Sequence, residues 1–311
     1  MDELRVGGFK SYGAVQRLPL APLTVLIGPN ASGKSNFLEA IHLLSWMARG
    51  QRLSGLVHAV RQQELPIRGP VEDLPGMGTR DVELGASVDG LELDLKLRVD
   101  GSRARIVGEE LSEPASDSSF PYYRVERPAE DHGAELVVAY NNFARGGVKP
   151  QIHCVDDQAV LTQLRTPSRF SAGHERSQRE IPGACRRMAA ALEQLLFLDP
   201  RPAAMRDSSY REEVELAPDG SNVSAVLADL CENRGRRDDV LEFVRALPEQ
   251  DIRSIGFLNG ARGDVMVELE ESFERSRRTM HAGILSDGTL RVLAIAAAVL
   301  SVPEGSAVVI E

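Results

Sequence analysis

The sequence is poor in the residues that mark several classes of protein. Only three of its 311 residues are cysteines, and they form no Cys-x-x-Cys pair, so they support neither a disulfide scaffold nor a zinc knuckle. Aromatic residues make up only 5% of the chain, and lysine occurs only four times among 36 basic residues. The net charge of −10 lacks the basic excess of small DNA-binding domains. Any contact with nucleic acid would therefore need a local basic patch.

Long hydrophobic runs are also missing. The longest, residues 292–302, is much shorter than the roughly 20 residues that span a bilayer. The first residues, Met1–Arg5, lack the basic start and apolar run of a signal peptide. We therefore expect a cytoplasmic protein with reduced thiols and no membrane partner. What remains is the composition of an ordinary globular protein, long enough for one large domain or two.

Hydrophobic periodicity predicts the main elements. The apolar run 23–27 predicts a strand buried on both faces, as in a parallel sheet, and a helix follows from Gly33 to Gly50. Alternation over 82–99, with Asp-Gly turns, predicts an antiparallel meander, which we place with 135–140 in a separate lobe over residues 82–140. The remaining expected strands are 4–9, 264–270 and 307–310, and the remaining expected helices are 188–198, 221–231, 239–247 and 287–301. Loops are expected at 51–80, with short helical pieces, and at 112–134 and 165–187.

One stretch of the chain is locally basic. Residues 165–187 hold six arginines, together with Ser, Gly and Pro: Arg165, Arg169, Arg176, Arg179, Arg186 and Arg187. The pattern favours a mobile, solvated loop. Contact with the phosphate backbone of DNA or RNA is the alternative.

A phosphate-binding loop is the most specific motif in the chain. Residues 28–35 read Gly-Pro-Asn-Ala-Ser-Gly-Lys-Ser and fit G-x-x-x-x-G-K-[ST] at every position, between a predicted strand and a predicted helix. In such a loop the backbone N–H groups and the helix N-terminus surround phosphate, the lysine adds positive charge, and the hydroxyl binds Mg²⁺. The alternative is a chance match in an ordinary turn. The candidate ATP-binding residues are Gly28, Pro29, Asn30, Ala31, Ser32, Gly33, Lys34 and Ser35.

A second candidate anion site lies near the C-terminus. Leu285-Ser-Asp-Gly-Thr289 opens an apolar helix, so Ser286 and Gly288 lie at a positive helix end. An ordinary N-cap by Ser286 or Asp287 is the alternative. The apolar strand 307–310 then leads to an acid, Glu311.

Together these motifs resemble a known family. Gly8-Phe-Lys-Ser-Tyr12, residues 28–36, Leu285-Ser-Asp-Gly-Thr-Leu-Arg291 and Val308-Val-Ile-Glu311 are similar to the RecF/SMC-like branch of ABC ATPases. Within it, the resemblance is greatest to AAA-type ATPases allied to the OLD (overcoming lysogenisation defect) proteins. Three middle segments share a looser similarity with that group: Phe197–Pro200, Met205-Arg206 and Leu216–Asn222.

The resemblance implies an α/β fold, an ABC-type P-loop NTPase head. In such a head a mixed or parallel sheet is flanked by helices, and an antiparallel β-lobe and a helical insertion are added to it. Residues 1–50 would form the N-terminal part of the ATPase core, and residues 281–311 would complete it with the signature helix and the Walker B strand. Residues 51–280 would hold the β-lobe and the helical insertion.

The resemblance also implies how ATP is held. Two heads form a homodimer around two ATP molecules, with Asn30, Gly33, Lys34, Ser35 and Asn36 binding the triphosphate and Mg²⁺ in cis. Ser286 and Gly288 would reach the γ-phosphate in trans. Glu311 would hold Mg²⁺ together with Ser35, and Lys34 and Glu311 would be the catalytic residues. Lys10 and Ser11 lie where such heads often touch the nucleotide.

Three departures from the family pattern bear on activity. Asp287 stands where many ABC proteins have Gly, and Glu311 stands where Asp is commoner. The catalytic glutamate, D-loop and switch histidine that follow in the family are absent, so we expect this chain to be a truncated form of a longer protein.

These observations predict an ATP-binding ABC-type ATPase that dimerises on ATP. It would gate a nuclease or another activity on DNA or RNA, as in anti-phage defence or DNA maintenance. A nucleotide-sensing interaction module with little hydrolysis, a RecF-like DNA-repair ATPase and a small-molecule kinase are the alternatives.

Overall fold

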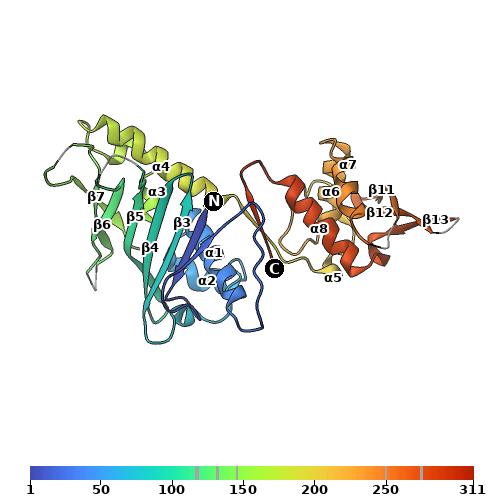
Figure 1. Cartoon of the computed structure of the whole chain (residues 1–311), viewed down its shortest axis with the longest axis horizontal. Helices are drawn as coiled ribbons and strands as arrows, with labels where there is room; N and C mark the ends of the chain where they lie inside the picture. The colour runs from blue at the N-terminus through green and yellow to red at the C-terminus, as the bar shows by residue number, and fades with distance from the viewer. Residues whose placement is uncertain (116–118, 131–132, 145, 249–250, 274–275) are drawn as a thin grey trace. The chain divides into compact units, whose positions relative to one another are not determined.

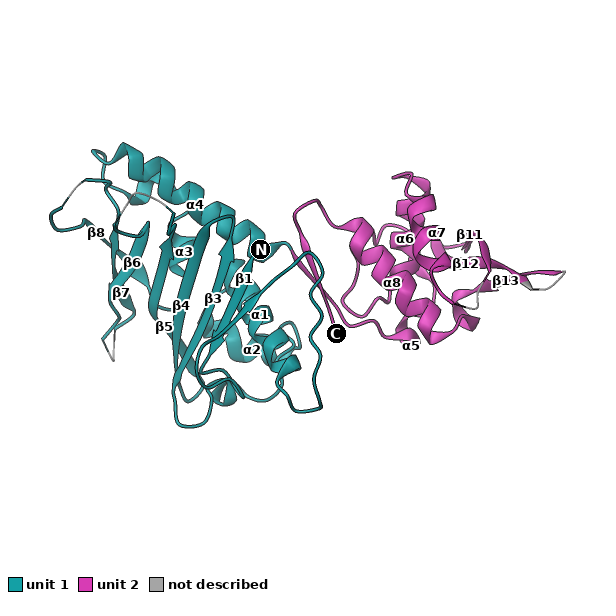
Figure 2. Cartoon of the chain, viewed as in Figure 1, with its two compact units in different colours: residues 1–194 teal, residues 195–311 magenta. Residues whose placement is uncertain are grey.

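The chain divides into two compact units (Figure 2). The computed structural model describes residues 1–115, 119–130, 133–144, 146–248, 251–273 and 276–311. Unit 1 is Met1–Gln194 and unit 2 is Leu195–Glu311. Each unit contains sheet and helix, so the mixed α/β class is confirmed. Within the described residues, the structure contains no helix with the length and apolar character needed to cross a membrane.

Unit 1 is built on one antiparallel sheet of eight strands, in the order β2-β1-β3-β4-β5-β6-β7-β8 (Figure 1). The strands are β1 (Glu3–Gly7), β2 (Gln16–Pro19), β3 (Asp81–Val88), β4 (Leu91–Asp100), β5 (Arg103–Ser112), β6 (Tyr123–Arg127), β7 (Glu135–Tyr140) and β8 (Gln151–Val155). Its helices are α1 (Lys34–Ala48), α2 (Leu56–Arg61), α3 (Val160–Gln163) and α4 (Glu175–Glu193). Short 3₁₀ turns at Leu53–Gly55, Val71–Asp73 and Pro167–Arg169 complete it.

The predicted meander is confirmed. The alternate side chains of β4, from Leu91 to Val99, are all buried on one face of the sheet. Asp89 and Gly90 both have positive φ, 48° and 79°, which fits a two-residue type I′ hairpin between β3 and β4. The expected separation of this lobe is wrong, because β1 pairs with β3 along five residues. The free edge of β3 is thus closed by the N-terminal strand, and meander and N-terminus share one sheet.

The prediction of an exposed loop over 165–187 is wrong from Glu175 onward, where α4 begins. Ile181, Cys185, Met188 and Leu192 follow one another at helical spacing, and all four are buried. The arginines between them conceal this apolar stripe in the sequence. The predicted helix 188–198 accordingly ends at Glu193, and β9 (Leu195–Leu198) follows. The predicted loop 112–134 contains β6, whose Tyr123 is fully buried, and its residues 116–118 and 131–132 lie outside the described residues.

The strand predicted at 23–27 is not formed. This segment has no strand assignment, and Leu23, Val25 and Ile27 are 82%, 67% and 91% exposed. A strand buried on both faces needs neighbours along its edges to satisfy its backbone groups. In unit 1 the ladder on this side ends with β2, and none of the described strands pairs with residues 23–27. Apolar composition alone therefore does not produce the strand.

Unit 2 combines a small antiparallel sheet with helices. Its strands are β10 (Ser209–Tyr210), β11 (Ile252–Asn259), β12 (Asp264–Phe273) and β13 (Ser276–His281), and a parallel pair joins β9 to β14 (Ala307–Ile310). Its helices are α5 (Pro202–Met205), α6 (Val223–Glu232), α7 (Arg237–Arg245) and α8 (Asp287–Ser301), with a 3₁₀ turn at Ala282–Ile284. Apolar side chains of α6, α7, α8 and the sheet form one core. A larger parallel ATPase sheet stays a prediction. The expected division of the chain into residues 1–50, 51–280 and 281–311 also stays a prediction.

Candidate nucleotide-binding site

The phosphate-binding loop runs directly into α1. Gly33, with φ of 94°, is the last residue before the helix, and Ala31 also has positive φ, 66°. A β-carbon at Gly33 would approach Ser11 Oγ to 2.9 Å, and one at Gly28 would approach Ser32 Oγ to 2.7 Å. Gly33 therefore has a left-handed φ that favours glycine, whereas a β-carbon at Gly28 would displace the Ser32 hydroxyl. This geometry suits a loop whose backbone N–H groups surround an anion.

Lys34 folds back over its own loop. Its Nζ donates hydrogen bonds to the carbonyl oxygens of Gly28, at 2.7 Å, and Pro29, at 2.9 Å. The first turn of α1 contains no acid, and among the residues that the structure describes no side chain caps the N-terminal end. The first amides and the positive helix end are thus suited to receive an anion. A phosphate oxygen would replace neutral carbonyl acceptors with a charged acceptor for the ammonium group, which forms a stronger hydrogen bond.

The segment Gly8–Tyr12 supports the loop from the side. Phe9 is fully buried and anchors it. The Tyr12 hydroxyl donates to the Gly33 carbonyl oxygen at 3.2 Å, and burial raises the pKa of this hydroxyl, so it stays protonated. Asn36 Nδ2 donates to Ser11 Oγ at 2.8 Å. Ser11 and Tyr12 therefore hold both sides of the junction between loop and helix.

A buried carboxylate at Glu39 was missed from the sequence. Its side chain is 5% exposed and pairs through Oε2 with Lys10 Nζ and through Oε1 with Arg68 Nε, at 2.5 Å. Lys10 Nζ also donates to the Arg68 carbonyl oxygen at 2.7 Å, and Arg68 Nη2 donates to Asn36 Oδ1 at 3.1 Å. Lys10 is thus engaged by α1. The sequence offered one weak signal that Glu39 is buried: it lies four residues before Leu43, on the buried side of the helix.

The C-terminal candidates lie in unit 2. Ser286 is the N-cap of α8, and its Oγ accepts a hydrogen bond from Thr289 N at 3.1 Å. Gly288 is in the first turn of α8. Glu311 follows β14, is exposed, and its N–H donates to the Leu198 carbonyl oxygen at 3.0 Å. The N-cap geometry fits both interpretations of Leu285–Thr289, an ordinary cap and a phosphate-facing helix end.

The candidate residues are therefore divided between the units. Gly28–Asn36 lie together in unit 1, while Ser286 and Gly288 lie together at the start of α8 in unit 2. Ser35 is in the first turn of α1 and Glu311 is at the end of β14. Their roles toward ATP and Mg²⁺ stay predictions.

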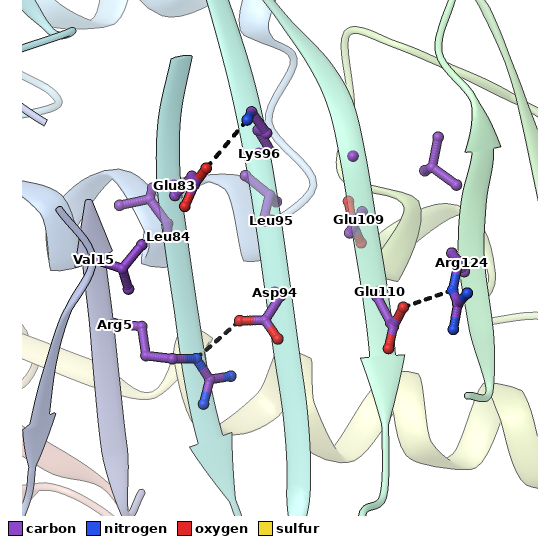
Figure 3. A pocket seen from close by; sticks show the side chains of 12 residues that line it. Arg5, Val15, Glu83, Leu84, Asp94, Leu95, Lys96, Glu109, Glu110 and Arg124 are labelled. Atoms are coloured by element: carbon purple, nitrogen blue, oxygen red, sulfur yellow. Dashed lines mark hydrogen bonds and ion pairs between the residues drawn. The ribbon is translucent and has the colours of Figure 1, made fainter. Parts of the chain in front are cut away.

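A separate hollow of about 320 Å³ lies on the charged face of the unit 1 sheet (Figure 3). It is lined from β1, β3, β4, β5 and β6 and does not include the phosphate loop. The figure shows three ion pairs among its lining residues: Arg5–Asp94, Lys96–Glu83 and Arg124–Glu110. Because these charges neutralise one another within the sheet, the hollow gives no excess of positive charge for a phosphate.

Comparison with known proteins finds a family match over a region that contains the phosphate loop. Residues 23–135 match the protein-family model described as "AAA domain, putative AbiEii toxin, Type IV TA system". A DNA replication and repair protein RecF from Acaryochloris marina is 36% identical over 110 residues, which are 35% of this chain and 26% of that protein. The matches support an ABC-type ATPase.

Two further relatives extend the comparison. The RecF protein of Anaeromyxobacter dehalogenans is 36% identical over 105 residues, 33% of this chain and 27% of that protein. Structural maintenance of chromosomes protein 1 of Arabidopsis thaliana is 36% identical over 72 residues, 22% of this chain and 6% of that protein. The chain thus spans about a quarter of the length of the RecF relatives that it matches. The similarity supports nucleotide binding and ATPase character, and it leaves the OLD-like assignment a prediction.

Proposed function

We propose that this chain is an ATP-binding, ABC-type ATPase subunit that forms a dimer on ATP and acts in DNA maintenance. One observation carries the proposal: a complete phosphate loop enters α1 through Gly33, whose left-handed φ favours glycine. The names of the RecF and SMC relatives support the link to DNA. More specifically, we propose that the dimer controls a nuclease or another effector, as in anti-phage defence.

Different residues of the chain would bind the triphosphate, the Mg²⁺ ion and the γ-phosphate. The loop amides and Lys34 bind the triphosphate, and Gly33 allows its close approach. Asn30 in the loop and Asn36 in the first turn of α1 would add polar contacts to the triphosphate. Ser35 and Glu311 would hold Mg²⁺, which would neutralise part of the phosphate charge. Ser286 and Gly288 of a second copy would supply a helix N-terminus to the γ-phosphate.

Binding is tested with Lys34→Ala. We expect this variant to lose Mg–ATP binding while its circular dichroism stays that of the wild type, because the Lys34 ammonium bonds only to loop atoms in the contacts described. Lys149→Ala is the matched control, since it removes an equal charge from a lysine outside the loop. Unchanged ATP affinity of Lys34→Ala in equilibrium binding would remove the phosphate-loop assignment.

Assembly is tested with Ser286→Arg. This variant should bind the ATP analogue AMP-PNP as a monomer but fail to associate, because a long cation is placed at the proposed interface. A mixture of Lys34→Ala and Ser286→Arg chains should retain at most one competent site per dimer. Sedimentation velocity with Mg–AMP-PNP measures the association of Ser286→Arg alone and of the mixture. If Ser286→Arg associates like the wild type, residues 285–289 are an ordinary helix cap.

Hydrolysis separates the enzyme from the alternative, a nucleotide-sensing module. Phosphate release is measured in a single turnover on the full-length protein, with and without duplex DNA. Association without release of phosphate would favour the sensing module, whereas DNA-stimulated release would favour the RecF-like ATPase.

A further inference from the structure

Arg206 spans the whole turn that precedes α8. Its Nη1 donates to the carbonyl oxygens of Leu285, at 2.8 Å, and Gly283, at 3.2 Å, and its Nη2 donates to Asp287 Oδ1 at 2.6 Å. One guanidinium therefore fixes two backbone carbonyls and the first helical side chain of the same turn. The planar guanidinium presents its N–H donors in a fixed fork, whereas the three donors of an ammonium group rotate on a flexible stem.

The charge of Asp287 conflicts with a phosphate at this helix end. Asp287 lies between Ser286 and Gly288, the two residues proposed to face the γ-phosphate, and its side chain is 69% exposed. A carboxylate in the first turn stabilises the helix through the helix dipole. The same carboxylate repels an approaching triphosphate, unless a cation neutralises it locally. Arg206 is the cation that the structure pairs with it.

We propose that Arg206 is the positioning residue of the phosphate-facing end of α8. It neutralises Asp287 and holds the 283–287 turn, so that Ser286 and Gly288 can approach the triphosphate bound by a second copy. This inference rests on the proposed function, because it assumes that the start of α8 meets ATP across a dimer. It adds a residue about 80 positions before the motif to the set that determines association.

Three variants of the full chain test the charge directly. Arg206→Met keeps much of the stem length and removes the charge, and we expect it to raise the dimer dissociation constant with Mg–AMP-PNP at least tenfold. Asp287→Asn removes the repulsion and should associate at least as tightly as the wild type. The double variant Arg206→Met/Asp287→Asn should recover at least half of the loss on a logarithmic scale. A purely structural arginine gives no such recovery.

Salt and a second substitution give independent readouts. The defect of Arg206→Met should shrink between 0.05 and 0.5 M NaCl, about the range over which salt screens exposed charges. Arg206→Lys keeps the charge without the fork and should fall between Arg206→Met and the wild type. It also keeps the test decisive if Arg206→Met fails to fold, which thermal melts of the full chain would show.

The outcomes separate this inference from the proposed function. If the wild type associates, Ser286→Arg does not, and Arg206→Met associates like the wild type, the role of Arg206 is refuted and the dimer stands. A double variant no better than Arg206→Met likewise refutes neutralisation. If the wild type binds AMP-PNP but never associates, the proposed dimer is wrong and this inference fails with it.

Discussion

Replacing Lys10 with Met should loosen the start of α1. Among the described residues, Lys10 and Arg68 pair with the buried Glu39 carboxylate, and the Lys10 side chain is only 12% exposed. In Lys10→Met, Glu39 keeps only Arg68, whose side chain is 68% exposed. The substitution thus leaves a buried carboxylate with a single, well-hydrated partner.

The size of the effect follows from burial. Removing one partner of a buried ion pair costs about 3–5 kcal/mol when the remaining charge has no compensation. Because Arg68 still pairs with Glu39, we expect a smaller cost of about 2 kcal/mol, below that range. For a unit of 194 residues this corresponds to a fall in Tm of about 4–8 °C. Replacing both charges, in Lys10→Met/Glu39→Met, should restore most of the loss, since two apolar side chains of similar size need no pairing.

The only tryptophan, Trp46, reports on this region because it lies in α1. Urea denaturation followed by Trp46 fluorescence gives the free energy of unfolding of unit 1 for the wild type, both single variants and the double variant. The costs of the single variants should exceed that of the double variant, with a coupling of at least about 1 kcal/mol. Strictly additive costs, or a Lys10→Met midpoint equal to that of the wild type, would refute the reasoning.

Three further predictions concern unit 1. Burial raises the pKa of the Glu109 carboxyl to about 7, although hydrogen bonds from Tyr123, Leu161 and Val160 oppose this rise. Because the folded state then binds the proton more tightly than the unfolded state, folding stability should fall by roughly 3 kcal/mol as the pH rises from about 4.5 to above 7. Glu109→Gln should lose this pH dependence in urea titrations, and an unchanged slope would contradict it. Burial lowers the pKa of His42 to about 4, so folding stability should fall by about 1–2 kcal/mol as the pH drops from 6.5 to 4. In the same urea titrations, His42→Gln should not show this loss of stability at low pH. Leu97→Ala should cost about 2–5 kcal/mol, because Leu97 is fully buried in the sheet, and thermal unfolding would measure it.

Elements with a local pattern were predictable from the sequence. The meander follows from a period of two and from an Asp-Gly hairpin, and both are properties of adjacent residues. The helices α1 and α8 follow from helical spacing, with a glycine or serine immediately before the first turn. The strand predicted at 23–27 failed because a buried strand depends on its neighbours, which the segment's own composition does not supply. The first part of α4, residues 175–187, was missed because its arginines are more conspicuous than its buried stripe.

In the phosphate loop, too, some features follow from adjacent residues and others depend on distant parts of the chain. Its chemistry is local: two glycines, a lysine and a hydroxyl within eight residues identify the anion that it suits. Its supports come from elsewhere in the chain, because Tyr12 contacts the Gly33 carbonyl and Arg68 contacts Asn36. These contacts join residues that are 21 and 32 positions apart, and they leave no periodic trace in the sequence. A motif therefore predicts what binds, whereas the geometry that holds the motif has to be read from the fold.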